Sequence, residues 1–258
     1  MEFLSELTQN NIAAFLLLLL RFAGLFAFFP FFDNQLISTN IKGALVFFCA
    51  VLFFPLVPPM QYDWTLVEFM IAGGMEILLG FCVGMVLQFV FSAITFGGDL
   101  MSFSMGLTMA SAYDPVSGVQ KPIIAQVIAL LALVLALSLD FHHGLFILVA
   151  QSFHALPLGT FALQDQFVQY CVNAFGSMML VGLAMAFPVM AVLLLSDVIF
   201  GMIMKTNPQF NLLAIGFPIK IAIGFVVLMM IVGSIMYHFK LQTSEAFEFI
   251  KMMFWSVN

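Results

Sequence analysis

The chain has 258 residues, of which 64 % are hydrophobic and 8 % charged, and its formal net charge is −6. A soluble domain of this size needs about a quarter of its residues charged to cover its surface. The chain has only 7 basic and 13 acidic side chains, which excludes a soluble domain. The mean hydropathy of +1.16 indicates an integral membrane protein, and the lack of a basic stripe argues against nucleic acid as a partner. Three cysteines at unrelated spacings predict neither a disulfide framework nor a metal motif.

About six apolar runs are long enough to cross a membrane as helices, since a crossing takes about 20 mostly apolar residues. These runs occupy residues 11–32, 41–57, 66–94, 123–139, 167–195 and 214–237. A shorter run at 144–153 predicts a re-entrant or peripheral helix. The expected fold class is therefore an all-α polytopic membrane protein. No linker or clear internal repeat divides the chain, so residues 1–258 are expected to form a single domain.

One cation lies inside the first apolar run. Arg21 stands about ten residues into it, where a charge costs at least a few kcal/mol unless it is paired or reaches water. The position predicts either an acidic partner, with Asp33 and Asp99 as candidates, or a side chain that extends to the membrane interface.

Small and polar residues follow one face of the third apolar run. Gly73, Glu76, Gly80, Gly84 and Gln88 recur at steps of three or four, which places them on one helical stripe. Gly80 and Gly84 form a GxxxG pair, which lets another helix backbone approach closely. The stripe predicts packing against protein. Its partner is either a helix of the same chain or, as the sharper hypothesis of a subunit-packing stripe, a helix of another subunit.

A long polar island at residues 102–122 follows the third run. Its glycine, serine and proline residues disfavour a continuous helix, and Asp114-Pro115 starts a turn. Irregular backbone at membrane depth is tolerated only where protein buries it or where it lines water. From the residues alone, a connecting loop is the plain alternative.

Asp140, His142 and His143 resemble a metal or acid–base cluster in composition. A zinc site needs three or four supported ligands, and the remaining histidines, His154 and His238, stand at no ligand spacing. The set is expected to cap a helix boundary instead, with the glycine that follows supporting a turn. No metal, cofactor or catalytic residue is expected, and no sequence motif of an enzyme is found.

Four stretches resemble the FliR/SctT family of type III export-gate subunits, and they occur in that family's order. They are LRFAGLFAFFPFF at 20–32, MGLTMASAYDPVSGVQKPIIAQ at 105–126, DFHHGLFILVAQSFHALPLG at 140–159 and LLLSDVIFGMIMKTNPQFNLLAIGFPIKIAIGF at 193–225. The chain departs from the family at Met204-Lys205-Thr206, where an arginine is expected near Lys205.

The resemblance implies a channel subunit without enzymatic activity or cofactor, in the bacterial inner membrane at the flagellar basal body. It would help to form and close the pore through which unfolded flagellar proteins cross the membrane. Its implied partners are FliP-like and FliQ-like subunits, against which its helices pack as hairpins in a hetero-oligomer, and FlhB-like and FlhA-like proteins. The alternative is a small-solute secondary transporter, although the inverted repeats usual in transporters are not apparent.

The resemblance also gives the polar island a role, because the corresponding loop of the family projects into the pore as part of a plug. The implied plug residues are Gly106, Leu107, Thr108, Met109, Ala110, Ser111, Ala112, Tyr113, Asp114, Pro115, Val116, Ser117, Gly118, Val119, Gln120, Lys121 and Pro122.

Overall fold

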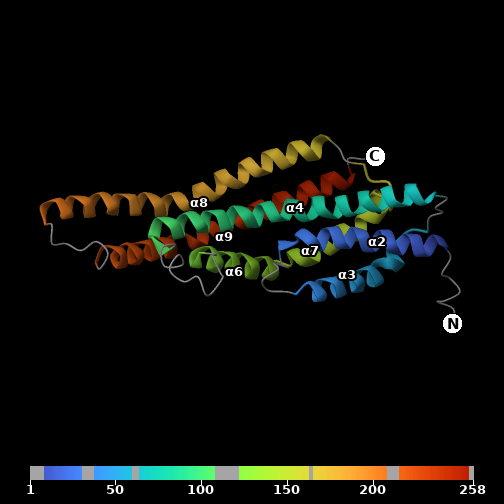
Figure 1. The fold of residues 1–258 in the computed structure, drawn as a ribbon, viewed down its shortest axis with the longest axis horizontal. Coiled ribbons are helices and arrows are strands. Elements are labelled where there is room, and N and C mark those ends of the chain that lie inside the picture. The colour runs from blue at the N-terminus through green and yellow to red at the C-terminus, as the bar shows by residue number, and fades with distance from the viewer. Residues whose placement is uncertain are drawn as a thin grey trace. The chain divides into compact units, whose positions relative to one another are not determined.

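The computed structural model describes residues 9–30, 38–59, 64–107, 122–162, 165–207 and 215–255, and all regular structure in those ranges is helical (Figure 1). The elements are α2 (Gln9–Phe28), α3 (Thr39–Phe53), the short 3-10 helix η2 (Phe54–Leu56), α4 (Leu66–Met105), α6 (Ile123–Ser138), α7 (Phe141–Ala155), α8 (Asp165–Thr206) and α9 (Phe217–Trp255). The predicted all-α fold class is confirmed.

Five helical segments in the described residues are long and apolar enough to cross a membrane: α2, α3 with η2, α4, α8 and α9. Helices α6 and α7 have 16 and 15 residues, and they would make a sixth crossing only together, as a broken span. The predicted short run at 144–153 lies inside α7. The polytopic membrane architecture is thus confirmed, but the fourth predicted segment, residues 123–139, forms only the 16-residue α6 and would cross only together with α7.

Three helices are much longer than predicted. Helices α4, α8 and α9 contain 40, 42 and 39 residues, whereas the predicted segments 66–94, 167–195 and 214–237 contain 29, 29 and 24. At about 1.5 Å per residue each is about 60 Å long, twice the roughly 30 Å of the hydrocarbon core. Helix α4 continues through Ser102 to Met105, so the polar island begins later than expected.

The contacts divide the chain into two compact units. Unit 1 comprises Met1–Phe89, Asp140–Ala174 and Thr243–Asn258, and unit 2 comprises Val90–Leu139 and Phe175–Gln242. Three of the boundaries fall inside α4, α8 and α9, so no linker separates the units at those points. A single domain over residues 1–258 stays a prediction.

Aromatic rings join the helices of unit 1. Helices α2 and α3 lie side by side (Figure 1). The ring of Phe53, at the end of α3, lies 5.3 Å from that of Phe22 on α2 and 6.4 Å from that of Phe153 on α7, measured between centroids. All three side chains are buried. Such ring pairs add to the free energy gained by burying apolar area, so this cluster is the core that holds α2, α3 and α7 together.

Close backbone contacts join the helices of unit 2. A Cβ atom added to Gly97 of α4 would lie 2.9 Å from the carbonyl oxygen of Gly182 on α8, and one added to Gly182 would lie 2.7 Å from that of Ala93. A Cβ added to Gly98 would lie 2.5 Å from Cα of Ala125 on α6. Small residues at a crossing allow helices to pack without intervening side chains, as is common in membrane bundles.

Candidate functional site

Arg21 and Glu76 form a buried ion pair in unit 1. Arg21 on α2 is 2 % exposed and Glu76 on α4 is fully buried. Nε of Arg21 donates to Oε2 of Glu76 at 2.5 Å, and Nη2 donates to Oε1 at 3.0 Å. A bidentate pair of this kind is among the strongest side-chain contacts, because both partners are charged and their geometries match. Loss of either partner would leave an uncompensated charge in the core.

Helix α7 and the residues after it satisfy the remaining polar atoms of this pair. Nη1 of Arg21 donates to Oγ of Ser152 at 3.0 Å, and Nη2 also donates to the carbonyl oxygen of Leu156 at 3.1 Å. The backbone N–H of Gly159 donates to Oε1 of Glu76 at 2.6 Å. Gly159 has φ +82°, which glycine adopts readily. The ion pair therefore ties α2 and α4 to the end of α7.

The predicted partners of Arg21 do not include the observed one. Asp33 lies outside the described residues, and the carboxylate that binds Arg21 belongs to Glu76 rather than to Asp99. Arg21 is buried, so it does not extend to the membrane interface. The sequence contained a usable signal, since Arg21 and Glu76 each stand about ten residues into their apolar runs and so lie at matching depth if the two helices are parallel.

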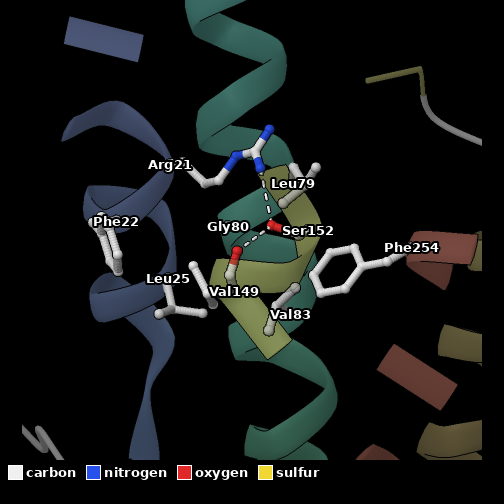
Figure 2. A pocket seen from close by; sticks show the side chains of 9 residues that line it. All are labelled: Arg21, Phe22, Leu25, Leu79, Gly80, Val83, Val149, Ser152 and Phe254. Atoms are coloured by element: carbon white, nitrogen blue, oxygen red, sulfur yellow. Dashed lines mark hydrogen bonds between the residues drawn. The ribbon is translucent and has the colours of Figure 1, made fainter. Parts of the chain in front are cut away.

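A small cavity lies beside Arg21 (Figure 2). Its walls are Arg21, Phe22, Leu25, Leu79, Gly80, Val83, Val149, Ser152 and Phe254. Figure 2 shows the guanidinium of Arg21 and the hydroxyl of Ser152 joined by a hydrogen bond, with Ser152 donating in turn to the carbonyl oxygen of Val149. The cavity volume of about 10 Å³ is far below that of small-molecule sites, so it is a packing gap and not a ligand pocket.

The glycine stripe of α4 packs against α2. A Cβ added to Gly80 would lie 2.2 Å from the carbonyl oxygen of Arg21, and one added to Gly24 of α2 would lie 2.2 Å from that of Ile77. A Cβ on Gly84 would lie 3.0 Å from the carbonyl oxygen of Leu25. Residues further along α4 contact residues further along α2, so the two helices run parallel here. Glycine is required at this crossing because the neighbouring atoms are backbone and cannot move aside cheaply.

The packing of α2 accounts for most of the stripe predicted on α4. Gly73, Glu76, Gly80 and Gly84 are buried inside the chain, whereas Gln88 is exposed. Helix α2 packs against the face that carries the first four residues, and the subunit-packing stripe of five residues stays a prediction. Sequence periodicity found the interface correctly but could not identify the helix that fills it.

Most of the predicted plug lies outside the described residues, since these omit residues 108–121. At the beginning of the predicted plug, Gly106 has φ +80°, and its N–H donates to the carbonyl oxygen of Phe103 at 3.0 Å. At its end, Pro122 occupies the position before α6. The plug assignment stays a prediction.

The acidic and histidine residues at the start of α7 do mark a helix boundary, but not through a side-chain cap. Asp140 stands at the N-cap position with φ 56° and makes no capping hydrogen bond from its side chain. Its Oδ1 lies 3.0 Å from Nδ1 of His143 instead. Gly144 is inside α7, where an added Cβ would meet the ring of Phe247 at 3.3 Å, so the prediction that it supports a turn is wrong.

Unit 2 contains a second ion pair. Nζ of Lys220 on α9 donates to Oδ2 of Asp197 on α8 at 2.7 Å. The side chain of Lys220 is 14 % exposed and that of Asp197 is 50 % exposed. A half-exposed carboxylate in a membrane helix avoids lipid and faces water or protein.

The family model for bacterial export proteins, family 1, matches residues 12–246, which include most of both units. The chain belongs to this family. The flagellar biosynthetic protein FliR of Bacillus subtilis is 30 % identical to it over 222 residues, covering 83 % of this chain and 84 % of the relative. FliR of Escherichia coli K12 is 28 % identical over 213 residues, covering 80 % and 79 %.

A relative from another secretion context also matches. The Yop proteins translocation protein T of Yersinia pestis is 26 % identical over 243 residues, covering 91 % of this chain and 92 % of the relative. The resemblance to the FliR/SctT family is confirmed by these matches. Members of the family are structural components of export apparatus, so the chain is an export component and not an enzyme.

Proposed function

We propose that this chain is a structural subunit of the flagellar type III protein-export gate, which helps to form and close the pore for unfolded flagellar proteins in the inner membrane at the basal body. The family match over residues 12–246, together with relatives named FliR, carries the proposal. The FliR relatives favour a flagellar system over an injectisome, since the B. subtilis protein is 30 % identical and the Y. pestis protein 26 %. A family of protein exporters also disfavours the small-solute transporter alternative.

The length of exposed apolar surface supports assembly with other subunits. On α8, exposed apolar side chains extend from Val168 at 51 % exposure to Ile203 at 39 %. At about 1.5 Å per residue this distance along the helix is about 53 Å. The hydrocarbon core is about 30 Å thick. Even at a tilt of about 40°, these exposed residues would span about 40 Å along the membrane normal. Lipid alone cannot cover such a helix, so other protein must.

Helices α4 and α9 support the same conclusion. Exposed apolar residues extend from Leu66 to Phe103 on α4 and from Ile219 to Met252 on α9. Only 28 % of the most apolar window of α8 and 17 % of that of α9 are buried within the chain. We assign the cover to FliP-like and FliQ-like subunits, with FlhB-like and FlhA-like proteins as further neighbours.

The Lys220–Asp197 pair is consistent with a pore or a subunit contact. Its half-exposed carboxylate requires water or a polar protein surface, and either is available in a multi-subunit channel. We assign residues 106–122 to the pore plug. The support for this assignment is the family resemblance and the composition of the segment, which favours irregular backbone over helix.

The plug and the channel are tested in one experiment. The full chain is expressed with FliP-like and FliQ-like subunits, either unchanged, with residues 108–121 deleted, or with the same residues replaced by a glycine–serine segment of equal length. Entry of a normally excluded small molecule into resting cells is measured together with the amount of assembled complex. We expect both variants to assemble and to leak, because each lacks the specific plug contacts.

Two outcomes would contradict parts of the proposal. Assembled variants with unchanged permeability would return residues 106–122 to the role of connecting loop, while leaving the subunit assignment in place. Solute uptake by the unchanged chain without any partner subunit would instead favour the secondary transporter.

A further inference from the structure

Three side chains suited to metal binding lie together at the start of α7 in unit 1. Asp140, His142 and His143 each offer one ligand atom, and these atoms all lie within 4.8 Å of one another. Asp140 and His143 are 70 % and 65 % exposed, so an ion in solution can reach them. Sequence spacing alone gave no reason to favour a metal here, because the other two histidines, His154 and His238, stand at no zinc-ligand spacing.

The backbone brings these side chains together in a way that helix capping does not explain. Asp140 has φ 56° and ψ 28°, the left-handed conformation that residues other than glycine adopt infrequently. A capping aspartate would accept a hydrogen bond from a free N–H of the first turn, and Asp140 accepts none there. Its carboxylate is turned to His143 instead, so the unusual conformation produces a contact between two potential ligands.

The spacing of the ligand atoms fits a small divalent ion. Zinc binds nitrogen and carboxylate oxygen at about 2.0–2.1 Å, which in tetrahedral geometry separates neighbouring ligand atoms by about 3.3 Å. Oδ1 of Asp140 and Nδ1 of His143 are 3.0 Å apart. The ring centroids of His142 and His143 are 4.0 Å apart, and the three ligand atoms all lie within 4.8 Å of one another.

In the cluster, His142 has a ring nitrogen that is available for coordination. Its Nδ1 is buried and has no hydrogen-bond partner in the described part of the chain. Coordination through this imidazole would break no hydrogen bond at Nδ1, and it would give the ring a polar partner that it lacks. Coordination by the other two residues replaces a single hydrogen bond between them.

We propose that Asp140, His142 and His143 bind one divalent transition-metal ion of the zinc class. Two imidazole nitrogens and one carboxylate oxygen suit zinc, cobalt or nickel, whereas calcium and magnesium prefer all-oxygen sites. Three protein ligands leave a position for water or for a fourth ligand. Since all three ligands belong to residues 140–143, the bound ion would hold Asp140 in its left-handed conformation.

The test measures metal binding and not export. The full-length chain is extracted from membranes with its accompanying subunits through a tag that contains no histidine, treated with a chelator, and titrated with Co²⁺ while visible absorption is recorded. Zn²⁺ competition then gives the zinc affinity. Asp140→Asn, Asp140→Gly, His143→Gln and His142→Gln are compared with the unchanged chain and with His154→Gln, a matched control on the same helix outside the cluster.

We expect one Co²⁺ per chain for the unchanged protein and for His154→Gln, with the absorption of an ordered nitrogen–oxygen site. The cluster variants should bind at least about tenfold more weakly, since even loss of an outer-shell partner of a metal site costs that much. Asp140→Gly keeps the left-handed backbone accessible, so its loss of binding would be attributable to the carboxylate. Equal binding by unchanged and cluster-variant proteins, or equal loss in His154→Gln, would overturn the proposal.

Discussion

At the scale of single residues, the ion pair of unit 1 shows how a membrane core accommodates charge. Arg21 and Glu76 pair across the parallel helices α2 and α4, and the hydroxyl of Ser152, the carbonyl of Leu156 and the N–H of Gly159 satisfy their remaining polar atoms. A buried pair is tolerated when it is complete and becomes costly when it is half removed. Substitution of either residue therefore tests the packing of α2, α4 and α7.

Removing one charge should destabilise the protein more than removing both. We expect Arg21→Leu to cost about 3–5 kcal/mol, because Glu76 is left as an unpaired buried charge. The double variant Arg21→Leu with Glu76→Leu should recover part of that loss, although Ser152 and Gly159 lose partners. Thermal unfolding in detergent, with membrane abundance in parallel, measures the difference. The single variant Glu76→Leu is measured as well. If the stability loss of the double variant equals the summed losses of the two single variants, the two charges do not interact.

The loss of stability on replacing a glycine of α4 by alanine should depend on the space beside that glycine. Gly80→Ala places Cβ 2.2 Å from a backbone oxygen of α2 and should cost about 1–3 kcal/mol through overpacking. Gly84→Ala, with its nearest atom at 3.0 Å, should cost less. Gly74→Ala is the matched control on the same helix, since nothing lies within 4 Å of its added Cβ, and it should be neutral or slightly stabilising. Equal stability of the three variants would exclude a tight crossing of α2 and α4.

At the scale of elements, the lengths of α4, α8 and α9 are the decisive property. Each is about twice as long as a bilayer crossing requires, and each carries exposed apolar side chains over most of its length. A soluble helix of this kind would aggregate, and a lipid-embedded one would project apolar surface into water. The proposed contacts with other subunits would resolve both problems.

Site-directed photo-crosslinking on α8 distinguishes lipid from protein as its cover. Val172 and Met202 are 68 % and 67 % exposed and lie about 45 Å apart along the helix, so both cannot contact the hydrocarbon core unless the helix is strongly tilted. We expect at least one of them to yield an adduct with another subunit. The buried Val189 of the same helix is the control and should yield none. Lipid adducts alone at both exposed positions would contradict a subunit cover for α8.

At the scale of the whole molecule, the chain has the properties of one component of a larger assembly. The family match extends over nearly all of it, and the exposed apolar faces are not confined to one segment. Within unit 1 the buried charges of Arg21 and Glu76 are paired, and glycines allow α2 and α4 to cross closely. What lacks cover is the outer surface of the long helices.

The chain expressed alone should therefore be recovered in low yield and as aggregates, whereas co-expression with FliP-like and FliQ-like subunits should give a monodisperse complex. The physical reason is the exposed apolar length of α4, α8 and α9, which detergent or lipid covers only in part. Size-exclusion chromatography with light scattering measures the outcome. A stable, monodisperse chain without partners would remove the physical argument for assembly.

The sequence by itself determined the fold class, the approximate positions of the apolar helices, the family and the helical stripe from Gly73 to Gly84. These properties depend on composition, on periodicity and on local order along the chain, all of which a sequence displays directly. The helix ends were less predictable, because α4, α8 and α9 continue past the ends of the apolar runs that predicted them.

Only the tertiary structure decided which residues meet. Arg21 binds Glu76, a residue that periodicity had assigned to the packing stripe, and the stripe packs against α2 of the same chain. The left-handed conformation of Asp140, which joins it to His143, is likewise invisible in the sequence. The physical reason is the same in each case: contacts between distant segments depend on helix direction, depth and crossing point, and a single sequence encodes these only through the packed structure as a whole.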